Sequence, residues 1–222
     1  EMCIRDSLKD LAYGQIYDAN RMTLAKLLDD LPVQCVDLGR LPDNPNNIDS
    51  ALQRASDNCD VLITSGGVSV GDADYIIECI KRHGELGFWR LNLKPGKPLA
   101  FGRIHSSWIL GLPGNPISAI ITALLVARPA LAHLAGTTLP DPLRINATLT
   151  NPIAHSRGRT EYQRGKFEFA NAVYTVAHTG EQGSNRLSSF RNANCLIEID
   201  SKRGDVNVGE QVVILPLTNL LH

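Results

Sequence analysis

The chain has 222 residues and a formal charge of −1, from 22 Lys and Arg against 23 Asp and Glu, so it is long enough for one large domain or two small ones. Its 43% of hydrophobic residues can supply a core, which excludes wholesale disorder, and its near-neutral charge argues against broad binding to nucleic acid or anionic membranes. Five cysteines without a CxxC pair fit neither a disulfide framework nor a zinc site, which indicates a reducing, cytoplasmic location.

The start of the chain offers no predicted strand over residues 1–13, although a doubly wound unit normally opens with one. The first clear pattern is a helix over residues 18–30. Residues 1–7 also lack the apolar core and the small-residue cleavage site of a signal peptide. We therefore expect an α/β domain whose first strand is missing, preceded by an unmatched segment over residues 1–13.

Apolar runs rich in β-branched residues then alternate with helical patterns, which predicts a parallel sheet covered by helices. The predicted strands cover residues 33–38, 60–64, 88–93, 99–101 and 108–110. The predicted helices cover residues 48–58, the segment from Asp72 or Asp74 to about 82, and residues 117–134.

Residues 106–127 carry no charge and come nearest to a membrane span. Gly111, Pro113, Gly114 and Pro116 interrupt this stretch and would break a helix in a bilayer. We therefore expect its second half to be a buried helix of a globular fold.

Turn-forming residues at 136–142 mark a change of pattern. Beyond them the helical periodicity ends, and short alternating segments at 144–150, 160–169, 173–178, 195–199 and 211–215 predict a small, barrel-like, all-β module. The domain prediction is thus an α/β domain over residues 14–138 and a β domain over residues 139–222.

A glycine-containing loop at 64–71 follows a buried strand and precedes a helix. Backbone N–H groups at such a position, with the hydroxyls of Ser65 and Ser69, suit a phosphate or another anion. A plain tight turn is the alternative. The chain has no P-loop pattern, so hydrolysis of a nucleotide by a Walker site is unsupported.

Two further loops could hold an anion. In Lys-Pro-Gly-Lys at 94–97, the prolines and glycine restrain two ammonium groups, with Arg90 as a third cation nearby. In Pro-Gly-Asn-Pro at 113–116, a rigid loop opens an apolar helix and Ser118 adds a hydroxyl near its first turn. Solvated surface lysines and a purely structural helix start are the alternatives.

Four aspartates, Asp18, Asp43, Asp72 and Asp74, occupy loops or helix starts. Two or three of them converging would suit Mg²⁺, although each alone is more typical of a cap or turn. The six histidines show no spacing typical of a metal site.

Segments 14–20, 65–75, 94–98 and 111–116 together resemble the molybdopterin molybdenumtransferases, called MoeA in bacteria. The resemblance runs from about Gly14 to the C-terminus and includes Gln-Gly-Ser at 182–184. It implies a transferase of molybdenum cofactor biosynthesis that inserts molybdate into the dithiolene of adenylylated molybdopterin, with a divalent cation, and releases AMP.

Carried over motif by motif, the resemblance implies three groups of site residues. The pterin phosphate and adenylate would be held by Ser65, Gly66, Gly67, Ser69 and Asn115. Molybdate would be held by Lys94, Lys97, Ser118, Arg159 and Ser184. Catalytic roles would fall to Asp43, Asp74 and Lys94, with Asp74 as a ligand of Mg²⁺.

The sequence departs from this family at its start. The family's first strand ends in Thr-Gly-Asp-Glu-Leu and follows two further domains that complete a homodimer, and neither is found here. We expect residues 1–7 to be foreign sequence on a truncated gene, and the fragment to be impaired. The alternatives are the related molybdopterin adenylyltransferase, which generally lacks the β module and is also an expected pathway partner, and a scaffold of the gephyrin kind.

Overall fold

The structure is a computed structural model that describes residues 3–5, 15–68, 75–185 and 187–221. Its first main sheet has four strands in the order β3 (Val61–Ser65), β7 (Ser107–Leu112), β6 (Pro98–Ile104) and β4 (Gly84–Arg90). β3 and β7 are parallel, whereas β7–β6 and β6–β4 are antiparallel. The α/β class is confirmed, but the sheet is mixed rather than wholly parallel. A two-residue connection between β6 and β7 forces the chain to reverse.

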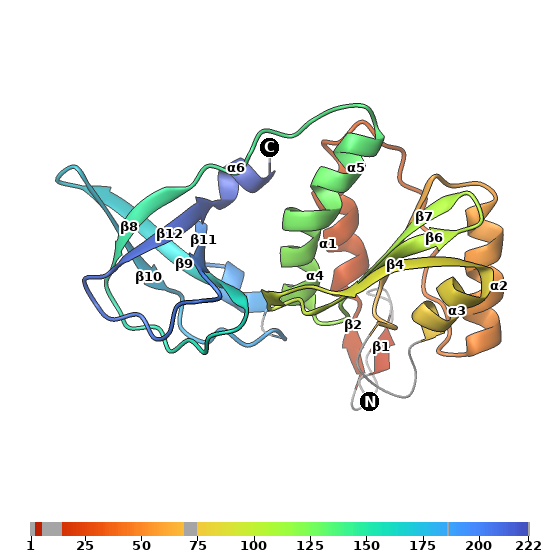
Figure 1. Ribbon diagram of the computed structural model, residues 1–222, viewed down its shortest axis with the longest axis horizontal. Helices are drawn as coiled ribbons and strands as arrows, with labels where there is room; N and C mark the ends of the chain where they lie inside the picture. Colours follow the sequence, from red (N-terminus) through yellow and green to blue (C-terminus); the bar gives the residue numbers. More distant parts are fainter. Residues whose placement is uncertain (1–2, 6–14, 69–74, 186, 222) are drawn as a thin grey trace.

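Helices cover both faces of this sheet (Figure 1). α2 (Pro45–Ser56) and α3 (Tyr75–His83) pack on one face, where the core includes Leu52, Ile80 and Ile109. α1 (Ala19–Leu28) and the long helix after β7 pack on the other, where the core includes Leu24 and Leu110. Ile109 and Leu110 face opposite sides because successive residues of a strand alternate between faces.

The long helix comprises α4 (Pro116–Thr122), a π-helical turn η1 (Ala123–Ala127) and α5 (Arg128–Leu134). The wider turn ends two residues before Pro129, which has no N–H to donate to the carbonyl of Leu125. By length and composition alone Pro116–Leu134 could cross a membrane, with a mean hydropathy of 1.7, but 61% of this window is buried inside the fold. It is therefore the core helix predicted over residues 117–134.

The N-terminal part differs from two predictions. Residues 1–13 do contain a strand, because β1 (Cys3–Arg5) pairs in parallel with β2 (Gln15–Tyr17) in a separate two-stranded sheet. Residues 33–38, predicted as a strand, form none. In the described chain no strand lies beside them to accept their backbone hydrogen bonds, and Val36 keeps 61% of its surface exposed.

The second main unit is a small closed barrel, as predicted. Its strands run in the order β10 (Val173–His178), β8 (Ile145–Leu149), β12 (Gln211–Pro216), β11 (Cys195–Ile199) and β9 (Thr160–Ala170), and pairing of β10 with β9 closes it. Two short helices, η2 (Leu187–Phe190) and α6 (Leu217–Leu221), flank the last strands.

The two units are joined by a strand and by a helix. β5 (Leu93–Lys94) leaves the region of the first sheet and pairs in parallel with β9 of the barrel. The long helix contributes Ile117 and Ile121 to an apolar cluster that includes Leu196 and Leu215 of the barrel. The predicted anion-binding loops around residues 94–97 therefore lie where the units meet.

Candidate functional site

A cleft of about 610 Å³ opens beside β5. One wall is the segment after β4, and the other is the loop at 156–159 that leads into β9. The nine lining residues are Arg90, Leu91, Asn92, Lys94, Lys97, Ser156, Arg157, Gly158 and Arg159. Five of them are cationic and none is acidic, so the cleft is suited to an anion.

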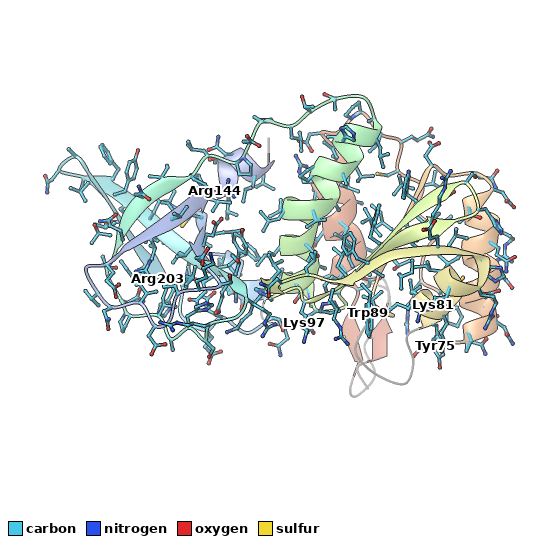
Figure 2. All side chains as sticks on the ribbon, viewed as in Figure 1. Tyr75, Lys81, Trp89, Lys97, Arg144 and Arg203 are labelled. Atoms are coloured by element: carbon cyan, nitrogen blue, oxygen red, sulfur yellow. The ribbon has the colours of Figure 1, made fainter. Side chains whose placement is uncertain are left out.

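Backbone pairing sets the spacing of the two walls. In the parallel pair of β5 and β9, Leu93 lies opposite Thr160 and Lys94 opposite Glu161. The N–H of Leu91 donates to the carbonyl of Lys97 at 2.9 Å, which closes the Lys-Pro-Gly-Lys loop on itself. The loop therefore presents its lysines from a fixed turn, and Figure 2 shows Lys97 where the two units meet.

Gly96 allows this loop to pack closely against the long helix. Its φ is 116°, and a Cβ at this position would lie 2.7 Å from the methyl carbon of Thr122 and 3.1 Å from Leu93. Any larger residue would therefore push the loop away from the helix.

Lys94 is held by a buried carboxylate. Its Nζ donates to Oε2 of Glu161 at 2.9 Å, and His155 Nδ1 donates to the same oxygen at 2.8 Å. Gln163 Nε2 donates to Oε1 at 3.0 Å. Burial, which leaves the Glu161 side chain 5% exposed, would raise its pKa, but the hydrogen bonds from His155, Lys94 and Gln163 outweigh it and hold the pKa below its usual value. Glu161 is thus a charged anchor behind the cleft.

A second buried charge fixes the neighbouring loop of the barrel. Arg164 is fully buried; its Nε donates to Ser189 Oγ at 3.0 Å and its Nη2 to the carbonyl of Gly183 at 3.3 Å. Burial lowers the pKa of Arg164 to about 10, against the opposing effect of Glu161. The backbone N–H of Arg164 also donates to Gln182 Oε1, so the Gln-Gly-Ser segment is positioned by the same residue.

The glycine loop and the Pro-Gly-Asn-Pro loop lie side by side. They follow parallel neighbours, because Ser65 at the end of β3 pairs with Leu112 at the end of β7. Asn20 Nδ2 donates at 2.7 Å to both Ser65 Oγ and the carbonyl of Gly114, and Ser65 Oγ donates to the carbonyl of Pro113 at 3.2 Å. The Ser65 hydroxyl therefore ties the two loops together.

A barrel loop reaches the start of the long helix. Asn115 Nδ2 donates to Ser184 Oγ at 3.1 Å, and the N–H of Ile117 donates to the Ser184 carbonyl at 3.1 Å. Ser118 is nearly buried below them, at 5% exposed, and its carbonyl accepts from Thr122 Oγ1. Ser118 and Ser184 thus adjoin the Pro-Gly-Asn-Pro loop and do not line the cleft.

The predicted site residues therefore separate into groups. Lys94, Lys97 and Arg159 line one cleft, whereas Asp43 lies on an exposed bend before α2 and is not among the lining residues. Gly66 and Gly67 adopt φ values of 93° and 72°, as a tight glycine turn requires. Ser69, Asp72 and Asp74 lie outside the described residues.

Three residues of the site, Arg157, Glu161 and His155, were not predicted from the sequence. For Arg157 the sequence carried a signal, because Arg-Gly-Arg at 157–159 places a glycine between two cations, as Lys-Pro-Gly-Lys does at 94–97. The structure then gives the two glycines similar φ values, 121° at Gly158 and 116° at Gly96. For Glu161 and His155 the sequence carried no such signal, since a buried hydrogen-bond partner is set by tertiary contacts.

Comparison with known families accounts for both units. Residues 6–133 match the family described as "Probable molybdopterin binding domain", and residues 146–217 match the "MoeA C-terminal region (domain IV)". The chain belongs to the molybdopterin-binding domain family.

Individual relatives agree with this assignment. The molybdopterin molybdenumtransferase of Haemophilus influenzae is 41% identical over 216 residues, covering 96% of this chain and 53% of the relative. Gephyrin of Dictyostelium discoideum is 32% identical, covering 96% of this chain and 34% of the relative. The crystal structure of a molybdopterin biosynthesis MoeA protein from Pyrococcus horikoshii superimposes with a TM-score of 0.79 at 25% identity, over 96% of this chain and 51% of that one. The chain thus spans about half the length of the molybdenumtransferase and of the MoeA structure.

Proposed function

We propose that this chain is the substrate-handling part of a molybdopterin molybdenumtransferase, which inserts molybdate into adenylylated molybdopterin and releases AMP. The observation that carries the proposal is the cleft between the two units, with five cationic and no acidic lining residues. Two relatives that cover 96% and 92% of this chain bear the name of this enzyme.

The cleft chemistry fits a tetrahedral oxyanion. Molybdate is a dianion, and ammonium and guanidinium groups can replace its hydration shell with charge-assisted hydrogen bonds. Lys97 and Arg159 approach from opposite walls, and Lys94 is oriented by Glu161. No nucleophilic side chain is required, because the dithiolene sulfurs of the substrate displace oxygens from molybdenum. The protein supplies orientation and charge neutralisation.

The pterin phosphate is assigned in this proposal to the glycine loop beside the Pro-Gly-Asn-Pro loop. The N–H of Gly66 already donates to the carbonyl of Leu112 at 2.9 Å, so this group holds the turn in shape. Phosphate contacts would then come from Gly67, Asn115 and the later part of the loop, which includes Ser69. Ser65 would act by fixing the turn, since its hydroxyl is hydrogen-bonded to Asn20 and Pro113.

Magnesium is part of the proposal through Asp74, which lies outside the described residues. Asp43 stands on an exposed bend, and the described residues bring no pair of carboxylates to the cleft. The described residues do not form a magnesium site by themselves, so no step is assigned to the ion. A homodimer, contact with the pathway's adenylyltransferase and a cytoplasmic location belong to the same proposal.

The β barrel argues against the related adenylyltransferase, which generally lacks this module. The gephyrin-like scaffold is not needed to explain the cationic cleft. Neither alternative is favoured by a specific contact in the described part of the chain.

Isothermal calorimetry with molybdate tests the assignment. We expect Lys97→Ala to weaken binding about tenfold or more, since a hydrogen bond to a charged group contributes about 1.5–3 kcal/mol. Ser184→Ala should weaken it less, because this hydroxyl adjoins the cleft only through the Pro-Gly-Asn-Pro loop. Lys81→Ala is the matched control, since Lys81 is an exposed lysine on α3, well separated from Lys97 in Figure 2. Unchanged affinity in both Lys97→Ala and Ser184→Ala would refute the pocket assignment.

A further inference from the structure

A cluster of three metal-ligating side chains lies on the opposite side of the α/β unit from the cationic cleft. Asp49 comes from α2, and Cys79 and His83 come from α3. One ligand atom from each lies within 4.8 Å of the others. In Figure 2, α3 carries Lys81 at the far end of the unit from Lys97, so this cluster is separate from the proposed molybdate site.

Helical spacing brings the three groups together. Cys79 and His83 are four residues apart, so both project from one face of α3. That face packs against α2, where Asp49 and Gln53 are also four residues apart. The arrangement is therefore built by two packed helices.

Polar atoms of Asp49, Gln53 and His83 lie within hydrogen-bond distance of one another at the centre of the cluster. His83 Nε2 lies 2.9 Å and 3.1 Å from the two carboxylate oxygens of Asp49, and also 3.2 Å from Gln53 Nε2. One ring nitrogen cannot both donate to the carboxylate and accept from the amide. Gln53 Nε2 instead donates to Asp49 Oδ2 at 2.7 Å, so the polar atoms of Asp49, Gln53 and His83 converge on one centre.

Burial makes the cluster accessible from one side only. Cys79 is 2% exposed, whereas the side chains of Asp49 and His83 are 17% and 21% exposed. The sulfur forms the floor, and the carboxylate and imidazole form the rim. Burial and the neighbouring Asp49 raise the pKa of the Cys79 thiol to about 12, with Arg82 opposing.

We propose that Asp49, Cys79 and His83 bind a divalent transition metal ion of the zinc class and so join α2 to α3. Thiolate, imidazole and carboxylate are the ligands that zinc uses, and a thiolate disfavours Mg²⁺ and Ca²⁺. Water or the Gln53 amide oxygen completes a tetrahedron. Binding displaces the Cys79 proton to solvent, and the sulfur then donates an electron pair to the metal.

Only small movements are needed. Metal–ligand bonds of about 2.0–2.3 Å place tetrahedral ligands roughly 3.3–3.8 Å apart, so the 2.9 Å contact between His83 and Asp49 must open by a few tenths of an ångström. Arg82, whose Nη1 lies 3.4 Å from Asp49, is exposed and can turn into solvent. His105 stays outside the ligand set, because its Nδ1 is hydrogen-bonded to Ser56 Oγ at 3.0 Å.

Cobalt titration of the full reduced chain tests the site. We expect one equivalent of Co²⁺ to produce a thiolate-to-cobalt charge-transfer band that zinc abolishes by competition. Cys79→Ser should eliminate the band, and Asp49→Asn, which keeps the thiol and the side-chain shape, should weaken binding at least about tenfold. Cys35→Ser is the control and should keep the band, since Cys35 is an exposed thiol elsewhere in the chain.

Two results of the cobalt titration would overturn the proposal: the absence of a band in the wild type, and a band that survives in Cys79→Ser. Molybdate affinity should be the same in Cys79→Ser as in the wild type, so failure of this site and failure of the proposed molybdate cleft can be told apart. Circular dichroism of Asp49→Asn shows whether a lost band comes from lost ligation or from unfolding.

Discussion

Both walls of the cleft carry positively charged side chains, but these side chains differ in whether they form ion pairs. On the wall from the α/β unit, Lys94 is paired with a buried carboxylate at 2.9 Å. On the wall from the barrel, Arg157 and Arg159 make no ion pair with any described residue. One wall therefore offers a cation of fixed position, and the other offers cations that can adapt to a ligand.

The glycines of the two walls show the same contrast. A Cβ at Gly96 would meet the long helix at 2.7 Å, whereas a Cβ at Gly158 would meet nothing within 4 Å. Similar backbone angles thus serve close packing in one loop and an open turn in the other. The lysine loop is therefore held against the long helix by close packing, and Gly158 of the arginine loop is not constrained in this way.

Loss of the buried anchor should have the largest effect. Glu161→Ala leaves His155, Arg164 and Lys94 without their carboxylate, and breaking a buried pair in this way costs about 3–5 kcal/mol of the free energy of unfolding. Urea unfolding measures this loss of unfolding free energy. Glu168→Ala is the control, since its exposed pair with Lys166 should contribute less than about 1 kcal/mol. Equal losses in the two variants would contradict the anchor.

The glycine contrast predicts unequal costs for the same substitution. Gly96→Ala and Gly158→Ala both force alanine into a strained backbone region, at roughly 1–3 kcal/mol. Gly96→Ala should cost about 1–3 kcal/mol more, because its methyl group collides with Thr122. Chemical denaturation of the pair compares them directly, and equal midpoints would mean that the lysine loop is not packed as described.

Low pH should reduce the stability that the hydrogen-bonded network around Glu161 contributes. The folded-state pKa of Glu161 lies below its ordinary value of 4.5, so the ionised network contributes stability above pH 4.5 that is lost as the pH falls through the folded-state pKa. The wild type should therefore lose more unfolding free energy below pH 4.5 than Glu161→Gln, which has no carboxyl group to titrate. Parallel pH profiles for the two proteins would exclude this role.

The smallest effect is expected at the contact between the barrel and the long helix. Asn115→Ala removes the hydrogen bond to Ser184 Oγ, which is partly exposed, so the loss should be about 0.5–1 kcal/mol. Thermal unfolding with Asn46→Ala as a surface control would detect it. A loss above about 2 kcal/mol would show that this contact contributes more to stability than one exposed hydrogen bond.

The sequence predicted correctly those helices and strands in which the spacing of apolar residues reflects which side chains are buried. The barrel strands and the helix over residues 117–134 were located within a few residues because alternating or helical apolar spacing matches their packing. The strand predicted at 33–38 was wrong because a β-branched pattern cannot show whether a neighbouring strand is present. The mixed sheet was missed because β6 and β7 are joined by a reversal too short for a parallel pair.

The candidate site was predictable where it lies on loops with their own sequence pattern. Lys94, Lys97 and Arg159 were predicted, and they line one cleft. Glu161 was not, since it meets Lys94 across 67 residues of sequence. The cluster of Asp49, Cys79 and His83 was also not predicted. Its ligands come from two helices, Asp49 and His83 are 34 residues apart in the sequence, and the three follow no typical metal-binding spacing.

The most direct test of the account is a calorimetric titration of molybdate into the wild type and into the double variant Lys97→Ala/Arg159→Ala, which removes one cation from each wall. We expect a single molybdate site in the wild type and a loss of affinity of about a hundredfold or more in the double variant, because two charge-assisted hydrogen bonds are removed. Equal affinity in the two proteins would show that the anion binds elsewhere and would contradict the assignment of this cleft.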